Sequence, residues 1–304
     1  MKPYIVTHDG IFHGDEVFAT AAIHLWLQVQ PSIRIDGDDI SPEDFDIVRS
    51  RDPGVIKDAY IAVDVGLEHA PEKGRFDHHQ AGGAGDRAIE RAPNVPTVTI
   101  PYASFGLVWK EFGAQVVRAV RPRLKADPAV VATMLDAGIV AHVDAGDHGP
   151  DYRNPEVRSP GFSLNRLIGG FNTGTTGDRF DEALNLAEKI LINEIAAAVE
   201  KAETDAAMAD VPVETLGTAR VGILPAYMRG WSGVDAVIHP DVKPDEGKPQ
   251  LWVLTVANTH IIPPTDHPGV LFRHNAGFMA KGISLEAMKA LAATVTVKES
   301  SVAG

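Results

Sequence analysis

The chain has no cysteine among its 304 residues. This absence excludes disulfides, thiolate metal sites and cysteine nucleophiles, so a metal site would have to use nitrogen and oxygen ligands. It also fits the cytoplasmic location that we expect. The sequence shows no apolar run near transmembrane length, and its first residues lead into a strand rather than a signal peptide. We therefore expect no membrane partner.

Positive charge is scarce, because 28 Lys and Arg face 41 Asp and Glu, a net charge of −13. Such a balance disfavours broad, sequence-independent binding of long nucleic acid, which requires a basic surface to release counterions. It is compatible with a local acidic site whose carboxylates hold divalent cations, which in turn receive an anionic substrate. A phosphate-bearing substrate would then be bound through metal and a few local Arg and Lys side chains.

The length suffices for two domains, and 44% hydrophobic with 23% charged residues is typical of a globular protein. Strands and helices alternate in the first half, which predicts an α/β domain over residues 1–177 with a mostly parallel sheet flanked by helices. Residues 178–209 have the pattern of one long connecting helix. Residues 210–304 predict a smaller α+β domain on the substrate side.

Periodicity and capping residues predict the individual elements. The expected helices cover residues 15–28, 104–112, 128–142, 162–171, 178–209 and 284–293, the last with Ser284 as its N-cap. The expected strands cover residues 3–8, 33–35, 47–49, 60–66, 220–224, 236–239 and 251–257.

Side chains that commonly bind metals gather in four segments, most of which directly follow an apolar strand. They are His8 with His13 and Asp15; Asp64; Asp77, His78 and His79; and Asp144 with Asp147 and His148. The ends of parallel strands converge, so these segments can meet in one pocket. Taken alone, residues 77–79 also fit a polar surface turn, and Asp147 with His148 a solvated loop.

Histidine and carboxylate ligands without cysteine favour Mn²⁺, with Mg²⁺, Co²⁺ or Zn²⁺ as alternatives. The candidates are too many for one ion. Two ions that share a bridging carboxylate would use them, and such pairs lie about 3.5–4 Å apart in enzymes that cleave phosphate esters.

Five motifs, in this order, resemble those of the Myg-type family, often described as metal-dependent protein hydrolases of the DHH phosphoesterase superfamily. They occupy residues 7–16, 63–66, 75–80, 143–149 and 273–278. The resemblance is strongest over residues 4–149, and His148 stands where the family usually has Asn. It implies a DHH-type catalytic domain.

The resemblance also implies roles for single residues. The metal ligands would be His8, His13, Asp15, Asp64, His78 and Asp144, with Asp64 as the bridge. His79 would face the phosphate as a catalytic residue or support a ligand, and Asp77 would orient a histidine. Near the C-terminus, Arg273, His274 and Lys281 are candidates for binding phosphate, or else exposed charges on an edge.

These observations lead to a dinuclear metal-dependent phosphoesterase. The resemblance favours a phosphodiesterase acting as a 3′–5′ exonuclease on RNA or short oligonucleotides. Two alternatives stay open: a small-molecule phosphatase or pyrophosphatase, and a non-catalytic metal-binding regulatory module. A peptidase lacks support, because the chain has no His-Glu-x-x-His motif. A homo-oligomer is possible in each case.

Overall fold

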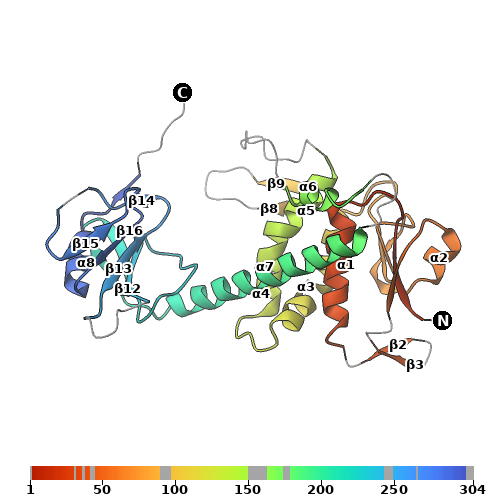
Figure 1. Cartoon of the computed structure of the whole chain (residues 1–304), viewed down its shortest axis with the longest axis horizontal. Coiled ribbons are helices and arrows are strands. Elements are labelled where there is room, and N and C mark those ends of the chain that lie inside the picture. Colours follow the sequence, from red (N-terminus) through yellow and green to blue (C-terminus); the bar gives the residue numbers. More distant parts are fainter. Residues whose placement is uncertain are drawn as a thin grey trace. The chain divides into compact units, whose positions relative to one another are not determined.

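The computed structural model describes residues 2–30, 32–35, 38–41, 45–89, 97–149, 163–173, 179–242, 249–264 and 266–298. The chain forms two compact units, Met1–Val199 and Glu200–Gly304, and each is considered by itself (Figure 1). The first is mixed α/β with a parallel-rich sheet flanked by helices, and the second is built on a separate sheet. This confirms the predicted mixed α/β class, with a parallel-rich sheet flanked by helices and a second domain.

The sheet of the first unit has five strands in the order β4-β1-β5-β7-β6. They are β1 (Tyr4–Thr7), β4 (Asp46–Arg49), β5 (Ile61–Val63), β6 (His69–Ala70) and β7 (Arg75–Phe76). Strand β1 pairs in parallel with β4 and β5, and β5 pairs in parallel with β7, whereas β6 runs antiparallel to β7. The four parallel strands therefore end at one edge, where open α/β sheets place their sites.

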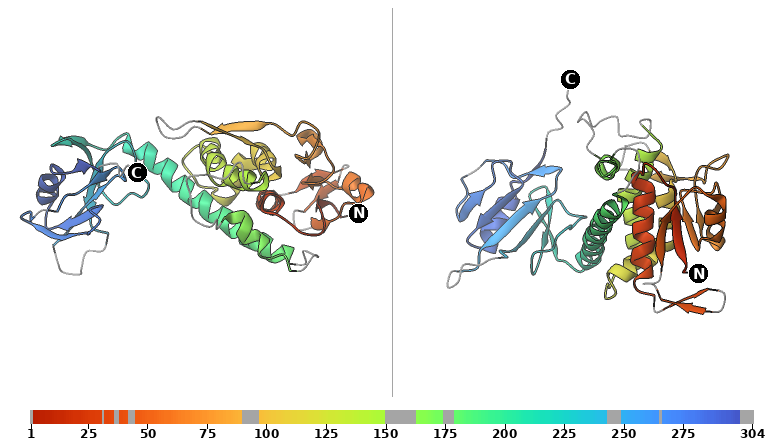
Figure 2. Two further views of the ribbon diagram at one scale, coloured as in Figure 1. Left: turned by 90° about the horizontal axis from the view of Figure 1, so that it is seen from above. Right: turned by 45° about the vertical axis from the view of Figure 1, so that its right-hand side comes forward.

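Helices cover both faces of this sheet. The helical segments of the unit are α1 (Gly14–Leu27), α2 (Pro53–Asp58), η2 (Pro71–Lys73), α3 (Ser104–Val120), α4 (Pro128–Leu135), η3 (Asp136–Val140), α5 (Ala141–Asp147) and α6 (Leu164–Gly169). Helices α1 and α3 pack against each other; α1 also contacts β5, and α3 contacts β7. Helix α2 packs on the opposite face of the sheet (Figure 2). Two hairpins, β2 (Ile33–Ile35) with β3 (Asp38–Ile40) and β8 (Asp86–Ile89) with β9 (Val98–Pro101), complete the strands.

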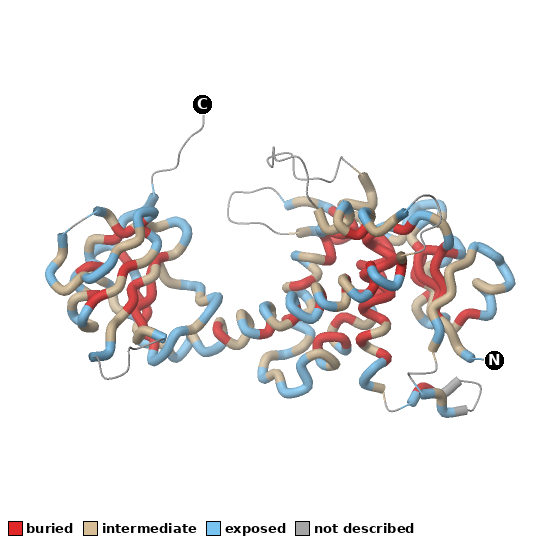
Figure 3. The backbone as a smooth tube through the Cα atoms, in the orientation of Figure 1, coloured by how far each residue is buried: buried red, intermediate tan, exposed pale blue. Residues whose placement is uncertain are grey.

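Helix α1 confirms the helix predicted over residues 15–28. It is buried along most of its length, because its residues are apolar nearly all round (Figure 3). A capping box starts it: the backbone N–H of His13 donates to Glu16 Oε1 at 2.7 Å. Asp15 and Glu16 thus lie in the first turn, at the positive end of the helix dipole. The same turn places both carboxylates beside the carboxyl edge of the sheet.

The segment after α3 differs from the single helix predicted over residues 128–142. Helix α4 passes into the π-helical turn η3, where Gly138 leaves helical geometry, and then into α5. Such π-turns insert an extra residue and are frequent at functional sites. Here the turn carries Asp136, whose carboxylate accepts a hydrogen bond from Arg87 at 2.7 Å.

The stretch Pro128–Asp147 has 20 residues and contains an 18-residue window with a mean hydropathy of 1.4, so by length and composition it could cross a membrane. The expectation that no apolar run approaches that length is therefore wrong. The stretch packs against α1 and α3 through buried residues such as Val131 and Val140. A core helix passes the same test of length and composition.

The second unit is built on a six-stranded sheet in the order β10-β11-β12-β13-β16-β15. Its strands are β10 (Val213–Leu216), β11 (Ala219–Ile223), β12 (Ala236–Pro240), β13 (Trp252–Val256), β15 (Val270–Arg273) and β16 (Met279–Gly282), and β14 (His260–Ile261) pairs with β17 (Thr296–Val297). Helix α8 (Leu285–Ala292) packs on this sheet, and Ser284 caps it as predicted. The long helix α7 (Phe180–Met208) contains the division between the units.

At Gly106, α3 lies close to the Asp144 side chain of α5. A Cβ there would overlap the Asp144 carboxylate and lie 2.8 Å from Arg87 Nη1. The Gly106 backbone N–H also donates to Asp144 Oδ1 at 3.1 Å. Only glycine therefore fits at this position, because any Cβ would lie too close to these two side chains.

We expect Gly106→Ala to destabilise the protein by about 1–3 kcal/mol, because a well-packed buried site must move to admit the methyl group. Chemical denaturation would measure the change. Gly169→Ala is the matched control: its Cβ would meet no atom within 4 Å. It should be neutral or stabilising by up to about 1 kcal/mol. Equal stability of wild type and Gly106→Ala would contradict the packing described.

Candidate metal centre at the carboxyl edge of the parallel sheet

Polar side chains from five places in the first unit meet at the carboxyl edge of its sheet. His8 follows β1, Asp64 follows β5, and the Asp77–His79 segment follows β7. The N-terminal turn of α1 and the C-terminal turn of α5 supply the remaining carboxylates and His148. The structure thus brings together most of the segments that the sequence marked.

Asp64 lies at the centre of this cluster. Its Oδ2 is 3.4 Å from His8 Nε2, whereas its Oδ1 is 3.3 Å from both His78 Nε2 and His79 Nδ1. Ser104 Oγ donates to the same Oδ1 at 3.0 Å. The carboxylate is buried, and its backbone φ of +56° is in the left-handed region that non-glycine residues rarely adopt. Its two oxygens therefore face histidines from different strands.

Four overlapping groups of side chains have ligand atoms close enough to hold a cation. They are His8, His13, Glu16 and Asp64; Asp64, His78 and His79; His78, Asp147 and His148; and His13, Asp15 and Asp147. Five of the six predicted metal ligands are in these groups. Asp64 joins the first two groups, and His78 and Asp147 extend the set toward α5.

The chemistry of these donors fits a cation. Both carboxylate oxygens of Asp15 and Oε2 of Glu16 are buried without a hydrogen-bond partner, and so is His78 Nε2. Buried charged groups are normally paired or bound to metal, because an unpaired buried charge is costly. Nitrogen and oxygen donors suit divalent ions of borderline to hard character.

The charges of the cluster shift its pKa values in opposite directions. Burial, reinforced by the nearby Asp64 and Asp147 carboxylates, raises the pKa of Asp15 well above its ordinary value. Burial would also raise the pKa of Asp64, but the neighbouring imidazoles of His78, His79 and His8 hold it well below the ordinary value. Asp64 is thus ionised, while Asp15 resists ionisation in the absence of a cation.

Two of the histidines next to Asp64, His8 and His79, have raised pKa values. Burial lowers the pKa of His8, yet its contacts with Asp64 and Glu16 outweigh this effect and raise it to about 10. The contact with Asp64 raises the pKa of His79 to about 9, with burial opposing and Asp77 adding to it. Both imidazoles therefore carry a proton near neutral pH when no metal competes.

Asp77 holds the loop on which the histidines lie. Its Oδ2 accepts the backbone N–H of Leu67 at 2.6 Å, and its Oδ1 accepts that of His79 at 3.0 Å. The same Oδ1 is 2.9 Å from His79 Nδ1. These contacts have the geometry of the orienting role predicted for Asp77. The His78 side chain is 8% exposed and that of His79 54%, so His79 faces the solvent side.

Asp144 differs from the prediction. Its carboxylate forms a buried ion pair with Arg87 and accepts the Gly106 backbone N–H, and it belongs to none of the metal-type groups. Burial raises its pKa to about 7, although Arg87 opposes this. Asp147, one turn later on α5, is the carboxylate that reaches His78, at 3.4 Å. The ion pair with Arg87 turns Asp144 away from the cluster.

Glu16, which the sequence analysis did not propose, belongs to the cluster. Its Oε1 is 2.9 Å from His8 Nε2, and it caps α1 through His13. The position of Glu16 next to Asp15 at a helix start could have predicted its place in the cluster, because neighbouring residues of the first turn lie beside the same strand end. Asn172 was also not predicted. Its Oδ1 accepts the Phe12 backbone N–H at 3.0 Å, and its Nδ2 donates to the Phe12 carbonyl at 2.8 Å, so Asn172 fixes the loop that precedes α1. No sequence pattern indicated it.

The predicted phosphate-binding residues of the second unit have protein partners. The Arg273 guanidinium donates to the Ile262 carbonyl, and Lys281 forms an ion pair with Asp241 at 2.6 Å. His274 Nδ1 accepts the backbone N–H of Ala276 at 3.1 Å. These contacts stabilise turns and strand pairs of that unit.

We expect Asp15→Asn to stabilise the metal-free protein by on the order of 1 kcal/mol, because it removes a buried carboxyl group whose oxygens accept no hydrogen bond. The same variant should lose most of the rise in melting temperature that Mn²⁺ produces in the wild type. Thermal denaturation with and without Mn²⁺ would measure both effects. Glu194→Gln, an exposed carboxylate on α7, is the control and should change neither. A wild-type melting temperature insensitive to Mn²⁺ would contradict a metal centre here.

The raised pKa of His8 predicts that metal binding releases protons. Below about pH 10 the His8 imidazolium must lose its proton to become a ligand, so affinity should rise by up to about tenfold per pH unit. In the metal-free protein the stabilisation by His8 is complete below its unfolded pKa of 6.5 and lost as the pH rises through about 10. Calorimetric titration of Mn²⁺ in buffers of different ionisation enthalpy would count the protons. His8→Gln should release fewer protons, and an unchanged count would contradict this assignment.

The chain matches the family model MYG1_exonuc, described as "Uncharacterised protein family (UPF0160)", over residues 4–221. A "MYG1 protein" of Dictyostelium discoideum is 30% identical over 188 residues, 60% of this chain and 50% of the relative. The "MYG1 exonuclease" of Homo sapiens is 34% identical over 150 residues, 48% of this chain and 36% of the relative. A MYG1 protein of Schizosaccharomyces pombe is 30% identical over 185 residues, 59% of this chain and 50% of the relative.

The chain thus aligns with half or less of the length of these relatives. No solved structure matches it significantly. The family model nevertheless covers well over half of the chain, including every residue of the cluster around Asp64. The protein is therefore a member of the Myg-type family, as its motifs predicted.

Proposed function

We propose that this protein is a metal-dependent phosphoesterase that cleaves phosphodiester bonds at an end of RNA or of short oligonucleotides. The observation that carries the proposal is the position of Asp64, whose two oxygens face His8 on one side and His78 with His79 on the other. A carboxylate shared in this way is the bridge that two neighbouring cations need. The mammalian relatives are named exonucleases, which supports the choice of nucleic acid.

We assign one cation to His8, His13, Glu16 and Asp64, and a second to Asp64, Asp15, His78 and Asp147. Mn²⁺ suits this set of imidazoles and carboxylates, with Mg²⁺, Co²⁺ and Zn²⁺ as alternatives. Asp147 replaces Asp144 in this assignment, because Asp144 is already paired with Arg87. The Asp77-His78-His79 motif supports a place in the DHH phosphoesterase superfamily.

When bound, divalent cations neutralise phosphate charge and lower the pKa of water, which is the chemistry that phosphodiester hydrolysis requires. His79 supplies a proton. Its Nδ1 is held by Asp77 and Asp64, which leaves Nε2 for a phosphate oxygen or the leaving oxygen. In the metal-free protein, contacts with Asp64 and Asp77 raise the pKa of His79 to about 9, which favours the protonated ring that a proton donor requires.

The overall charge of −13 supports short or terminal substrates over long duplexes. A small-molecule phosphatase or pyrophosphatase would use the same cations, and a regulatory module would bind them without turnover. Assays with different substrates separate these functions.

We expect the purified protein with Mn²⁺ to shorten a linear RNA from one end and to leave a circular RNA intact. EDTA should abolish this activity. Asp64→Asn should reduce the rate by about 10³-fold or more, because it removes the shared ligand, and His79→Gln by about 10²–10⁴-fold. Arg123→Gln, an exposed residue after α3, should match the wild type. RNA labelled at either end would give the polarity of cleavage.

Two outcomes would contradict the proposal. Hydrolysis of pyrophosphate with no cleavage of RNA or of a dinucleotide would indicate the small-molecule enzyme. Mn²⁺ binding that depends on Asp64, without turnover of any of these substrates, would indicate the regulatory module.

A further inference from the structure

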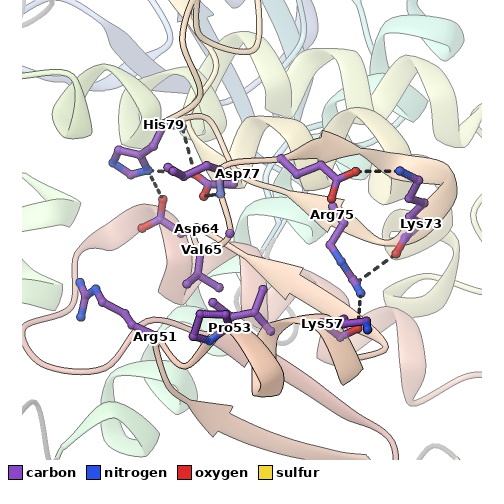
Figure 4. A pocket seen from close by; sticks show the side chains of 13 residues that line it. Arg51, Pro53, Lys57, Asp64, Val65, Lys73, Arg75, Asp77 and His79 are labelled. Atoms are coloured by element: carbon purple, nitrogen blue, oxygen red, sulfur yellow. Dashed lines mark hydrogen bonds and ion pairs between the residues drawn. The ribbon is translucent and has the colours of Figure 1, made fainter.

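A cavity opens next to the cluster of metal-type side chains around Asp64. Its volume is about 780 Å³, and it lies between α2, the loop after β4, the loop after β5, and β7 (Figure 4). Pockets for small molecules and cofactors fall in the range of about 300–1,000 Å³. The cavity is formed entirely by the first unit, so its walls are defined by one compact body.

This cavity adjoins a smaller one, of about 350 Å³, that contains His8, His13 and Asp147 of the cluster. Arg51, Asp64 and His79 line both cavities. The two spaces therefore meet at the carboxylate that we assign as the metal bridge. A phosphate placed there would have a guanidinium and an imidazolium beside it, and the group attached to the phosphate would extend into the larger cavity.

The larger cavity has an apolar wall made by Pro53, Ile56, Val65 and Leu67. Leu67 is 66% exposed and has a φ of +56°. An exposed leucine in the left-handed region carries a cost in both hydration and backbone strain, and such costs concentrate at binding sites. The hydrogen bond from its backbone N–H to Asp77 Oδ2, at 2.6 Å, holds this conformation. The wall is thus built to present an apolar side chain to the cavity.

The cationic residues that line the cavity differ in the hydrogen bonds and ion pairs that they form with other protein groups. Arg75 donates to the carbonyls of Lys57 and Ala59 at 3.1 and 3.0 Å, and Lys73 pairs with Glu68 at 2.8 Å. Arg51 forms an ion pair with the Asp9 carboxylate, at 2.6 Å, and also donates to the Asp9 carbonyl, and both side chains are more than half exposed. Exposed pairs contribute little energy, so Arg51 can turn toward an anion at low cost.

We propose that the larger cavity receives the terminal nucleoside of the substrate, with its base against Leu67 and Ile56, and that Arg51 binds the adjoining phosphate. This inference rests on the proposed function and adds that the site recognises the terminal nucleoside together with its phosphate. A nucleobase has a broad apolar face that matches the wall, and its phosphate is the anion that Arg51 matches. One nucleoside in a pocket beside the bridge carboxylate would release nucleoside monophosphates one at a time.

Calorimetric titration of a nucleoside 5′-monophosphate, the nucleoside and inorganic phosphate would test the pocket without turnover. The wild type should bind the monophosphate more tightly than either part. Arg51→Gln should weaken monophosphate binding by about tenfold or more and leave the nucleoside unchanged. Leu67→Ser should weaken both by about three- to tenfold. The matched controls are Arg123→Gln and Leu271→Ser, whose leucine is 60% exposed in the second unit.

A turnover assay separates this inference from the proposed function. The wild type should cleave an oligonucleotide with a normal terminal nucleotide faster than one with an abasic end, and Leu67→Ser should lose this preference. If no diester is cleaved, the proposed function fails and the titrations alone decide the pocket. The inference is overturned if the monophosphate binds no more tightly than inorganic phosphate, or equally in the wild type and both variants.

Discussion

The burial of several carboxylates around Asp64 is the constraint on which the first unit depends. Asp15, Glu16 and Asp64 are all buried, and Asp147 joins them from α5. Like charges in a low-dielectric interior repel strongly, so the fold must hold them against an unfavourable energy. The parallel sheet and α1 provide that energy, because both are buried and apolar. A buried, apolar part of the unit thus supports its least favourable charges.

The elements of the fold act on this cluster through backbone geometry as well as packing. The left-handed conformation of Asp64 turns its carboxylate between His8 and the two histidines after β7. The capping box of α1 gives Glu16 two tasks, closing the helix and contacting His8. Asp77 ties the β5 loop to the β7 loop through Leu67 and His79. Local stability and the arrangement of donors therefore use the same contacts.

One loop, from Asp64 to Leu67, faces two chemical environments. Its first residue belongs to the charged cluster, and its last forms the apolar wall of the larger cavity. Both residues have positive φ values, which places the strain where the two cavities adjoin. This combination suits the nucleotide that we propose as the substrate unit, because a nucleotide joins an anionic phosphate to an aromatic base.

The sequence by itself determined the nitrogen and oxygen donor types of the candidate site, the parallel-rich sheet, the helix α1, and the helix α8 with Ser284 as its cap. These follow from composition and from periodicity within short windows, and the convergence of strand ends placed His8, Asp64 and His78 together. Only the tertiary structure decided that Asp147 and Glu16 join the cluster while Asp144 does not. Asp144 is held by Arg87, 57 positions away, and by the close approach of Gly106. Such partners depend on packing between distant segments, which local sequence patterns do not encode.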